Sequence, residues 1–200
     1  MSVIINLSKL LMDRYINNNS VVIDATCGNG YDSNYLASNT KKVYSFDIQK
    51  EAIKLAKKNN KNFNNIIYIN DGHQNINKHI TESIDLSVFN LGYLPNFDKT
   101  ITTVFETTKQ AIEHSFDLLN NKKAIIITVY HGHTEGKKEA DLLTEYLSNI
   151  DKNKADIFLH KLINKPNTPP YIYEIVKRGG KANCSLDNEP IALAVGDSNG

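Results

Sequence analysis

Runs of apolar and β-branched residues alternate with helix-like segments along most of this chain, and that alternation limits the folds it can adopt. Short apolar runs, each of strand length, occupy residues 21–24, 42–47, 66–70, 84–90 and 124–130. Alternating strands and helices are typical of a parallel sheet covered by helices on both faces. The sequence therefore predicts a doubly wound α/β fold.

The order of the predicted helices and of the last two strands completes this fold. Apolar residues at helical spacing predict helices over residues 4–16, 31–38, 51–59, 100–119 and 135–149. Two further strands are expected at 155–161 and 171–177, joined by the loop INKPNTPP, which is too short for a helical crossover. We therefore expect a mostly parallel seven-stranded sheet that ends in an antiparallel hairpin.

Length and composition favour a single domain. The chain has 200 residues, of which 40% are hydrophobic and 22% charged, as in an ordinary globular protein. We place the domain at residues 1–178. The remaining 179–200 begin with GGKANCSLDNEP, which has no aromatic residue and no helical period, so we expect a tail outside the core.

The cysteines, the apolar runs and the net charge indicate the compartment and bear on the partners. Cys27 and Cys184 lie far apart in sequence, which fits a reducing compartment better than a disulfide framework. No apolar run reaches 18 residues, and charged residues interrupt the first 20, so we expect no membrane span, no signal peptide and a cytoplasmic location. The formal net charge of +1 argues neither for nor against nucleic acid.

A glycine loop follows the first predicted strand. In DATCGNG at 24–30, Gly28 and Gly30 stand where the strand must turn into a helix, and a backbone without side chains can approach a ligand closely. About twenty residues later, Asp47 ends the second predicted strand, where it could accept hydrogen bonds from a ribose diol. The pair indicates a nucleoside site, although a tight turn and a helix-capping aspartate would look alike.

The chain lacks residues that two common nucleotide-binding motifs require, and this narrows the choice of ligand. A dinucleotide fingerprint places Gly or Ala where this chain has Ser33, and no phosphate-binding P-loop motif is present. Asp24 would repel a pyrophosphate but suits a cationic or amino-acid moiety. S-adenosylmethionine carries such a moiety, while a nucleotide-binding dehydrogenase remains an alternative.

Several motifs taken together resemble one family. DATCGNG at 24–30, FDIQ at 46–49, NLGYLPNFDK at 90–99, YHGHTEG at 130–136 and NTPPYIYEIVKR at 167–178 are similar to class I S-adenosylmethionine-dependent methyltransferases. More narrowly, they resemble a small bacterial family labelled rRNA methylases, which includes a tRNA wobble-uridine methyltransferase. The resemblance runs from about residue 20 to 178 and implies the Rossmann-like class I methyltransferase fold.

The resemblance also implies cofactor contacts, which follow the chain from the first strand to the fourth. Asp24, Thr26, Gly28, Asn29 and Gly30 would surround the methionine end, Asp47 and Gln49 the ribose and adenine edge, Asp71, Gly72 and His73 the adenine, and Asn90 the methyl group. The glycine loop and Asp47 agree with the residue-based interpretation, since ligands of doubly wound sheets bind beyond the carboxyl ends of the strands.

Methyl transfer requires alignment of nucleophile, methyl and sulfur, and a free lone pair on the nucleophile. We expect Asn90 and Tyr93 to fix a target amine, and His131 or His133 to help it lose its proton, unless these histidines are structural. A metal at these two histidines is disfavoured because further ligands are lacking. Cys27 lies in the loop and is expected to pack there. Side chains expected to contact substrate are Tyr93, Pro95, Tyr130, His131, Asn167 and Pro169.

The expected partner is the anticodon region of tRNA. The resemblance implies methylation of the exocyclic amine of 5-aminomethyl-(2-thio)uridine at the wobble position, with rRNA or a small molecule as alternative substrates. A basic rim for the RNA backbone would be formed by Lys137, Lys138, Lys161, Lys165, Lys177 and Arg178, unless these residues only form a solvated face. Whether the chain forms a homodimer stays open.

Overall fold

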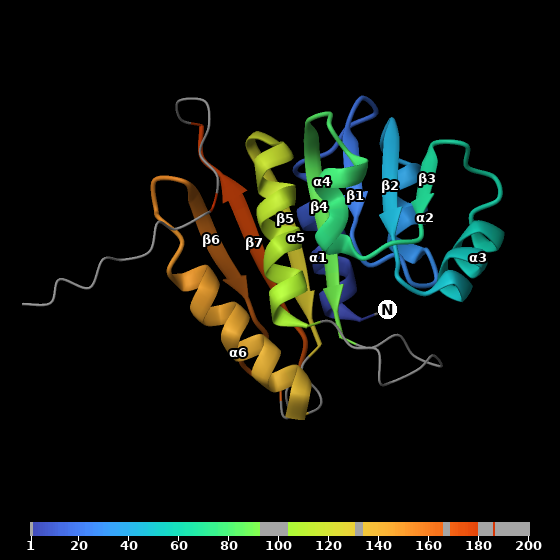
Figure 1. The fold of residues 1–200 in the computed structure, drawn as a ribbon. Coiled ribbons are helices and arrows are strands. Elements are labelled where there is room, and N and C mark those ends of the chain that lie inside the picture. Colours follow the sequence, from blue (N-terminus) through green and yellow to red (C-terminus); the bar gives the residue numbers. More distant parts are fainter. Residues whose placement is uncertain (1, 93–103, 131–133, 166–168, 180–185, 187–200) are drawn as a thin grey trace, which may run out of the picture.

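The computed structural model describes residues 2–92, 104–130, 134–165, 169–179 and 186 (Figure 1). Its strands are β1 (Val21–Asp24), β2 (Lys42–Phe46), β3 (Ile66–Ile69), β4 (Ile84–Leu91), β5 (Leu119–Val129), β6 (Ala155–His160) and β7 (Tyr171–Lys177). Its helices are α1 (Val3–Asp13), α2 (Tyr31–Ala37), α3 (Lys50–Asn59), η1 (His73–Asn75), α4 (Ile76–His79), α5 (Phe105–Leu118) and α6 (Thr134–Ser148).

The seven strands form one sheet in the order β3-β2-β1-β4-β5-β7-β6. The pairs from β3 to β5 are parallel, whereas β7 runs antiparallel to both β5 and β6. The predicted doubly wound sheet with an antiparallel last hairpin is therefore confirmed. The strand order reverses at β1 and β4, so the crevice beyond their carboxyl ends is the place where such sheets bind ligands.

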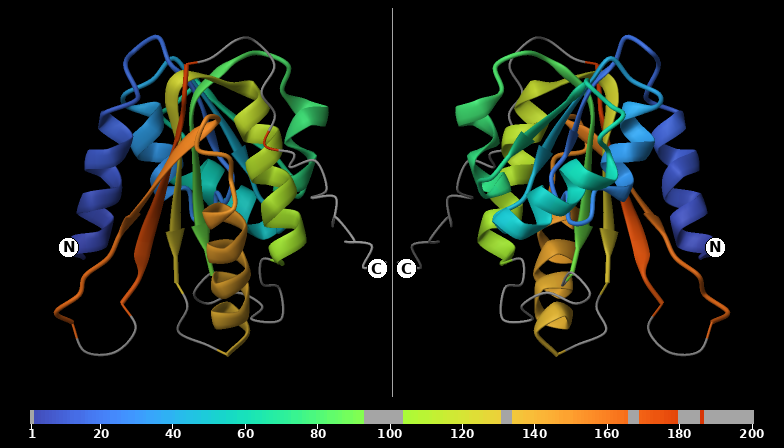
Figure 2. Two further views of the ribbon diagram at one scale, coloured as in Figure 1. Left: turned by 90° about the vertical axis from the view of Figure 1, so that its left-hand side faces the viewer. Right: turned by 90° about the vertical axis from the view of Figure 1, so that its right-hand side faces the viewer.

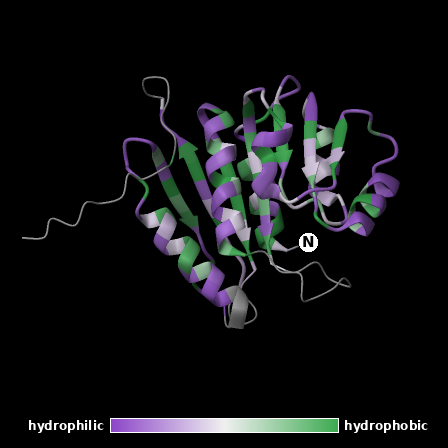
Figure 3. Cartoon of the chain, in the orientation of Figure 1, coloured by the Kyte–Doolittle hydropathy of each residue, from purple (hydrophilic) through white to green (hydrophobic). Residues whose placement is uncertain are grey.

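Helices cover both faces of the sheet (Figure 2). One apolar cluster joins α1 and α2 to one face through Met12, Leu36 and Val88, and the other cluster joins α4, α5 and α6 to the opposite face through residues such as Phe116. Figure 3 shows hydrophobic strands inside and hydrophilic residues on the outer surfaces of the helices. Among the described helices, none is both long enough and apolar enough to cross a bilayer.

Some element boundaries differ from those predicted. β5 begins at Leu119 rather than at 124, because the polar stretch Asn120–Lys123 extends the strand before its buried part. The helix predicted over 100–119 is α5, whose described part starts at Phe105. The short helices η1 and α4 were not predicted, since four or so residues are too few to show a helical period.

The segment after residue 178 is not wholly outside the core. Leu186 is 1% exposed and belongs to the apolar cluster beneath α5 and α6. The prediction of a tail outside the core is therefore wrong at this residue, because a single leucine can bury its side chain without any regular secondary structure around it.

A buried carboxylate connects α1 to the last hairpin. Glu174 in β7 is 1% exposed and accepts hydrogen bonds from Arg14 Nη1 at 3.1 Å, Tyr15 Oη at 2.5 Å and His160 Nε2 at 2.8 Å. Because a buried carboxylate is costly unless its oxygens are paired, these three donors stabilise both the charge and the position of α1.

We predict that Glu174→Ala lowers the free energy of unfolding by about 1.5–3 kcal/mol, since the variant leaves the buried Tyr15 hydroxyl without its acceptor. Arg14→Ala is the matched control, because its side chain is 61% exposed and an exposed pair contributes only about 0–1 kcal/mol. Urea titration measures both. Equal losses in the two variants would contradict the importance of burial.

Candidate cofactor site

The turn between β1 and α2 is built on two glycines in the left-handed region, Gly28 with φ 51° and Gly30 with φ 79°. A Cβ on Gly30 would lie 2.5 Å from Asn60 Nδ2 and 2.9 Å from Ala56 Cβ, so no larger residue fits against α3. The loop is also tied to β2, since Cys27 N donates to Phe46 O at 2.8 Å. The backbone of this loop is thus held close to the carboxyl ends of the strands.

Asp24 lies directly beneath this loop. Its side chain is fully buried, and its two oxygens accept hydrogen bonds from Thr26 N at 3.2 Å and Ser33 Oγ at 2.6 Å. Ser33 continues the chain of hydrogen bonds to Ser45 Oγ at 2.9 Å. Asp24 therefore supports the loop from below, and the hydroxyl at position 33, which weakened the dinucleotide interpretation, is what pairs with it.

The loop also reaches β4. Asn90 N donates to Thr26 Oγ1 at 2.7 Å, and Asn90 Nδ2 donates to Asp32 Oδ2 in the first turn of α2. Asn90 is only partly buried, at the carboxyl end of β4. The structure thus brings the glycine loop and Asn90 together, as the cofactor interpretation requires.

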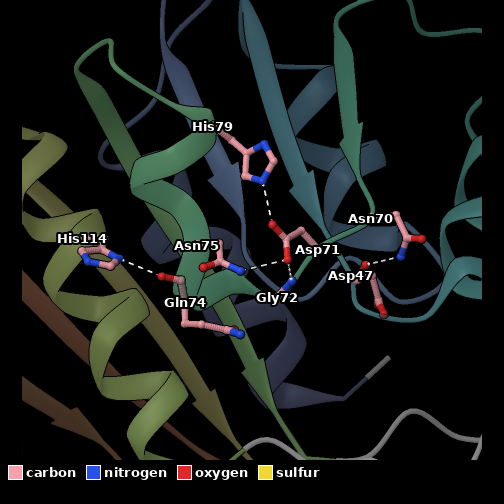
Figure 4. A network of polar contacts seen from close by, with 8 residues as sticks. All are labelled: Asp47, Asn70, Asp71, Gly72, Gln74, Asn75, His79 and His114. Carbon is pink, nitrogen blue, oxygen red and sulfur yellow. Dashed lines mark hydrogen bonds and ion pairs between the residues drawn. The ribbon is translucent and has the colours of Figure 1, made fainter.

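Asp47 stands on the other side of the loop. Its carboxylate accepts hydrogen bonds from Gly28 N and from Gln49 N, both at 2.8 Å, and it remains half-buried. Asn70 Nδ2 donates to Asp47 O at 2.9 Å, which joins the segment after β3 to the segment after β2 (Figure 4). Each carboxylate oxygen keeps a further lone pair, so Asp47 can still accept hydrogen bonds from a diol.

Asp71 is held by its own segment. Its carboxylate accepts hydrogen bonds from Gly72 N at 2.7 Å, Asn75 Nδ2 at 2.9 Å and His79 Nε2 at 2.8 Å (Figure 4). The hydrogen bond from His79, followed by that from Asn75, lowers the pKa of Asp71 below its ordinary value. Asp71 is therefore an ionised acceptor in a fixed orientation.

His73 differs from its neighbours because it points into the protein. Its Nδ1 lies 3.1 Å from Ala25 O, and its ring packs against Phe89 at a centroid distance of 5.7 Å. Burial lowers the pKa of His73, so the ring is neutral beside the backbone of the glycine loop. It supports the loop from the side opposite to α2.

Three carboxylates, Asp24, Asp32 and Asp47, surround the loop. Burial raises the pKa of each of them above its ordinary value, and the charge of Asp32 raises that of Asp24 further. The nearby Lys9 of α1 and the hydrogen bond from Asn90 act in the opposite direction on Asp32. The loop is thus surrounded by carboxyl groups whose ionisation a cationic ligand would favour and a phosphate would oppose.

Two buried side-chain atoms lack a hydrogen-bond partner in the described part of the chain, and both lie at this edge of the sheet. They are Asn29 Oδ1 in the glycine loop and Thr128 Oγ1, whose residue pairs with Asn90 across β4 and β5. Tyr130 follows β5 here, and burial together with the charge of Asp32 raises its pKa. Buried polar atoms without partners are uncommon and indicate where a ligand can bind.

Of the remaining predicted site residues, some lie in the described part of the chain and the others lie outside it. Pro169 is half-buried just before β7. Tyr93, Pro95, His131, His133 and Asn167 lie outside the described residues. Cys27 is buried, as expected for a packing residue, and burial raises the pKa of its thiol.

The predicted basic rim is wrong for two of its members. Because β7 is antiparallel to β5, Lys177 and Arg178 lie at the opposite edge of the sheet. There Lys177 Nζ donates to Phe116 O and Leu119 O, and Arg178 pairs with Asp156. The lysines at 137, 138, 161 and 165 follow β5 or β6, at the same edge as the glycine loop.

Sequence reasoning missed Asp32. An acidic residue in the first turn of a helix is expected for the helix dipole alone, so it carried no specific signal. Its spacing from the second glycine, GYD at 30–32, was the available clue, because it places the carboxylate beside the loop.

Comparison with known proteins agrees with this geometry. The family model described as "Putative rRNA methylase" matches residues 43–176. Among curated proteins, a chloroplastic tRNA (mnm(5)s(2)U34)-methyltransferase of Arabidopsis thaliana is 27% identical over 82% of this chain. The chain spans 66% of that relative's length, just under two thirds.

Two solved structures are similar throughout. SMU.1697c of Streptococcus mutans, described as a putative methyltransferase in complex with SAH, is 36% identical with a TM-score of 0.82, over 88% of this chain and 99% of that one. A protein described as a putative rRNA-methylase from Clostridium thermocellum is 34% identical with a TM-score of 0.85, over 88% of this chain and 98% of that one.

We predict that Asp24→Asn stabilises the protein without bound ligand. A raised pKa means that the native state holds the proton more tightly than the unfolded chain, so the stability associated with Asp24 is lost as the pH rises through the raised value. The amide can accept from Thr26 N and donate to Ser33 Oγ. We expect a gain of about 1 kcal/mol at pH 8, or ~2–4 °C in melting temperature, and a smaller gain at pH 5.

Thermal melts at the two pH values measure this difference, with Asp156→Asn as control, since Asp156 is exposed at the opposite edge and paired with Arg178. A variant that melts below the wild type at pH 8 would show that the ionised carboxylate stabilises the apo fold.

Proposed function

This chain belongs to the rRNA methylase family, and from that premise we propose that it methylates the exocyclic amine of 5-aminomethyl-(2-thio)uridine at the wobble position of tRNA. It is an S-adenosylmethionine-dependent methyltransferase with the class I fold. The family membership decides against the dehydrogenase alternative, for which the glycine loop and Asp47 would have served equally well.

The residues at the loop fit S-adenosylmethionine. The left-handed Gly28 leaves its backbone open to close approach while Gly30 packs against α3, and the surrounding carboxylates suit a sulfonium and an ammonium group. We assign the methionine end to the glycine loop with Asn29, the ribose to Asp47, and the adenine to Asp71 and Gly72. The cofactor supplies an electrophilic methyl group on sulfur.

The substrate is proposed from the named relative. The name of the Arabidopsis thaliana protein specifies uridine 34 of tRNA, and this is the observation that carries the proposal. Asn90 supports it, because its amide stands at the carboxyl end of β4 beside the loop and can hold an amine. In this proposal Tyr93 and Pro95 line the substrate side, and His131 or His133 accepts a proton from the amine.

The RNA partner is proposed on charge. Lys137, Lys138, Lys161 and Lys165 are exposed and stand on the two segments that follow β5 and β6. They lie at the same edge as Asn90, so phosphates bound there would bring an anticodon loop over the site. A substrate without a phosphate backbone, such as a small molecule, would not use them.

The test of the substrate is methyl transfer from labelled S-adenosylmethionine to tRNA that carries the aminomethyl group, compared with tRNA that lacks it. We expect label only in the aminomethylated tRNA, in a nucleoside heavier by one methyl group on mass spectrometry. Equal label in both tRNAs would assign another target atom, and label in rRNA or in no RNA would contradict the proposal.

A variant tests the RNA surface. The double variant Lys161→Ala, Lys165→Ala should weaken tRNA binding and reduce the slope of log affinity against log salt by roughly one to two, because each lost phosphate contact removes about one unit. The control is Lys41→Ala, Lys152→Ala, two exposed lysines at the opposite edge. Titrations at several salt concentrations give the slopes, and equal slopes in both variants would contradict this surface.

A further inference from the structure

The Asn90 side chain is held by a residue that the proposed function has not used. Asn90 Nδ2 donates to Oδ2 of Asp32, while the backbone N–H of the same residue donates to Thr26 Oγ1 at 2.7 Å. Thr26 belongs to the glycine loop and Asp32 to the first turn of α2. Both the main chain and the side chain of Asn90 are therefore fixed by the segment 26–32.

The chemistry of Asp32 decides which way the Asn90 amide faces. An ionised carboxylate only accepts hydrogen bonds, so it pairs with the amide nitrogen and repels the amide oxygen. A rotated amide would place two acceptors against each other in a partly buried site. Asn90 Oδ1 is therefore presented on the side away from Asp32.

We propose that Asp32 is a positioning residue that locks the Asn90 amide with Oδ1 toward the target amine, and this inference rests on the proposed function. A neutral amine has N–H groups and one lone pair. When Oδ1 accepts one N–H, the lone pair stays free for the reaction; a rotated amide would instead donate to that lone pair and block it.

The lone pair then forms the N–C bond, while the electron pair of the breaking S–C bond remains on sulfur as a neutral thioether. The nitrogen is left as a secondary ammonium, whose proton goes to water. Asp32 takes no part in these bond changes and acts on the reacting amine through Asn90.

The groups around Asp32 come from three other elements. Lys9 of α1 favours its charged form, while Asp24 of β1 and Tyr130 after β5 share its electrostatic environment. A protonated Asp32 could donate to Oδ1 and release the lock. Turnover should therefore fall at acidic pH together with the ionisation of Asp32.

The first experiment is a double-mutant cycle with Asp32→Asn, Asn90→Ala and the double variant, with aminomethylated tRNA as substrate. Each single variant should lower kcat by about 10- to 100-fold. The double variant should be no slower than Asn90→Ala, because Asp32 acts through Asn90. The rates are compared at saturating S-adenosylmethionine, because loss of a carboxylate beside the loop also weakens cofactor binding, and Asp156→Asn should match the wild type throughout.

Two outcomes of this experiment would contradict different proposals. Independent losses, so that the double variant falls by the product of both factors, would overturn the positioning role, since Asp32 would then act by itself. A wild-type protein that methylates no aminomethylated tRNA would overturn the proposed function instead.

The second experiment needs no turnover. In ¹⁵N-labelled wild-type protein, one side-chain amide proton of Asn90 should be shifted downfield, and its shift should follow pH as Asp32 titrates. Asn90→Asp assigns the signal. An Asn90 amide signal that ignores pH between 4 and 8, and is unchanged in Asp32→Asn, would sink the proposal.

Discussion

The rest of the site depends on the hydrogen bonds that a fully buried carboxylate accepts beneath the glycine loop. Asp24 ends β1 in the middle of the sheet, where an unpaired charge would be prohibitive. The amide of Thr26 and the hydroxyl of Ser33 satisfy its oxygens, and they come from the two sides of the turn. Opening the loop would remove these two donors from the buried Asp24 carboxylate, so Asp24 helps to hold the loop in this shape.

Contacts of the same loop also fix its position relative to the neighbouring strands. The left-handed Gly30 packs against α3 with no space for a side chain, and the Cys27 amide pairs with β2. Thr26 and Asp32 hold Asn90 of β4. The two strands that flank β1 are thus joined through one short loop. These contacts make the crevice at the topological switch point a rigid site.

The sequence predicted the position of this loop, and the reasons are local. A glycine turn after a buried strand and an acidic residue after the next strand both fall at the carboxyl edge of a parallel sheet, so the positions of Gly28, Gly30 and Asp47 could be predicted. Asp32 could not, because an acid in the first turn of a helix suits the helix dipole anyway. Lys177 and Arg178 were misplaced although the antiparallel hairpin was predicted, since reversing β7 sends its end to the opposite edge. Burial of Leu186 has no periodic signal at all.

The same carboxylates that shape the loop work against the stability of the empty site. Burial raises the pKa of Asp24, Asp32 and Asp47, so their ionised forms are penalised at neutral pH. A ligand that brings positive charge removes part of this penalty, and its binding is therefore coupled to their ionisation. In the proposed reaction a sulfonium becomes a neutral thioether, so the sulfur charge that would favour cofactor binding beside these carboxylates is absent from the product.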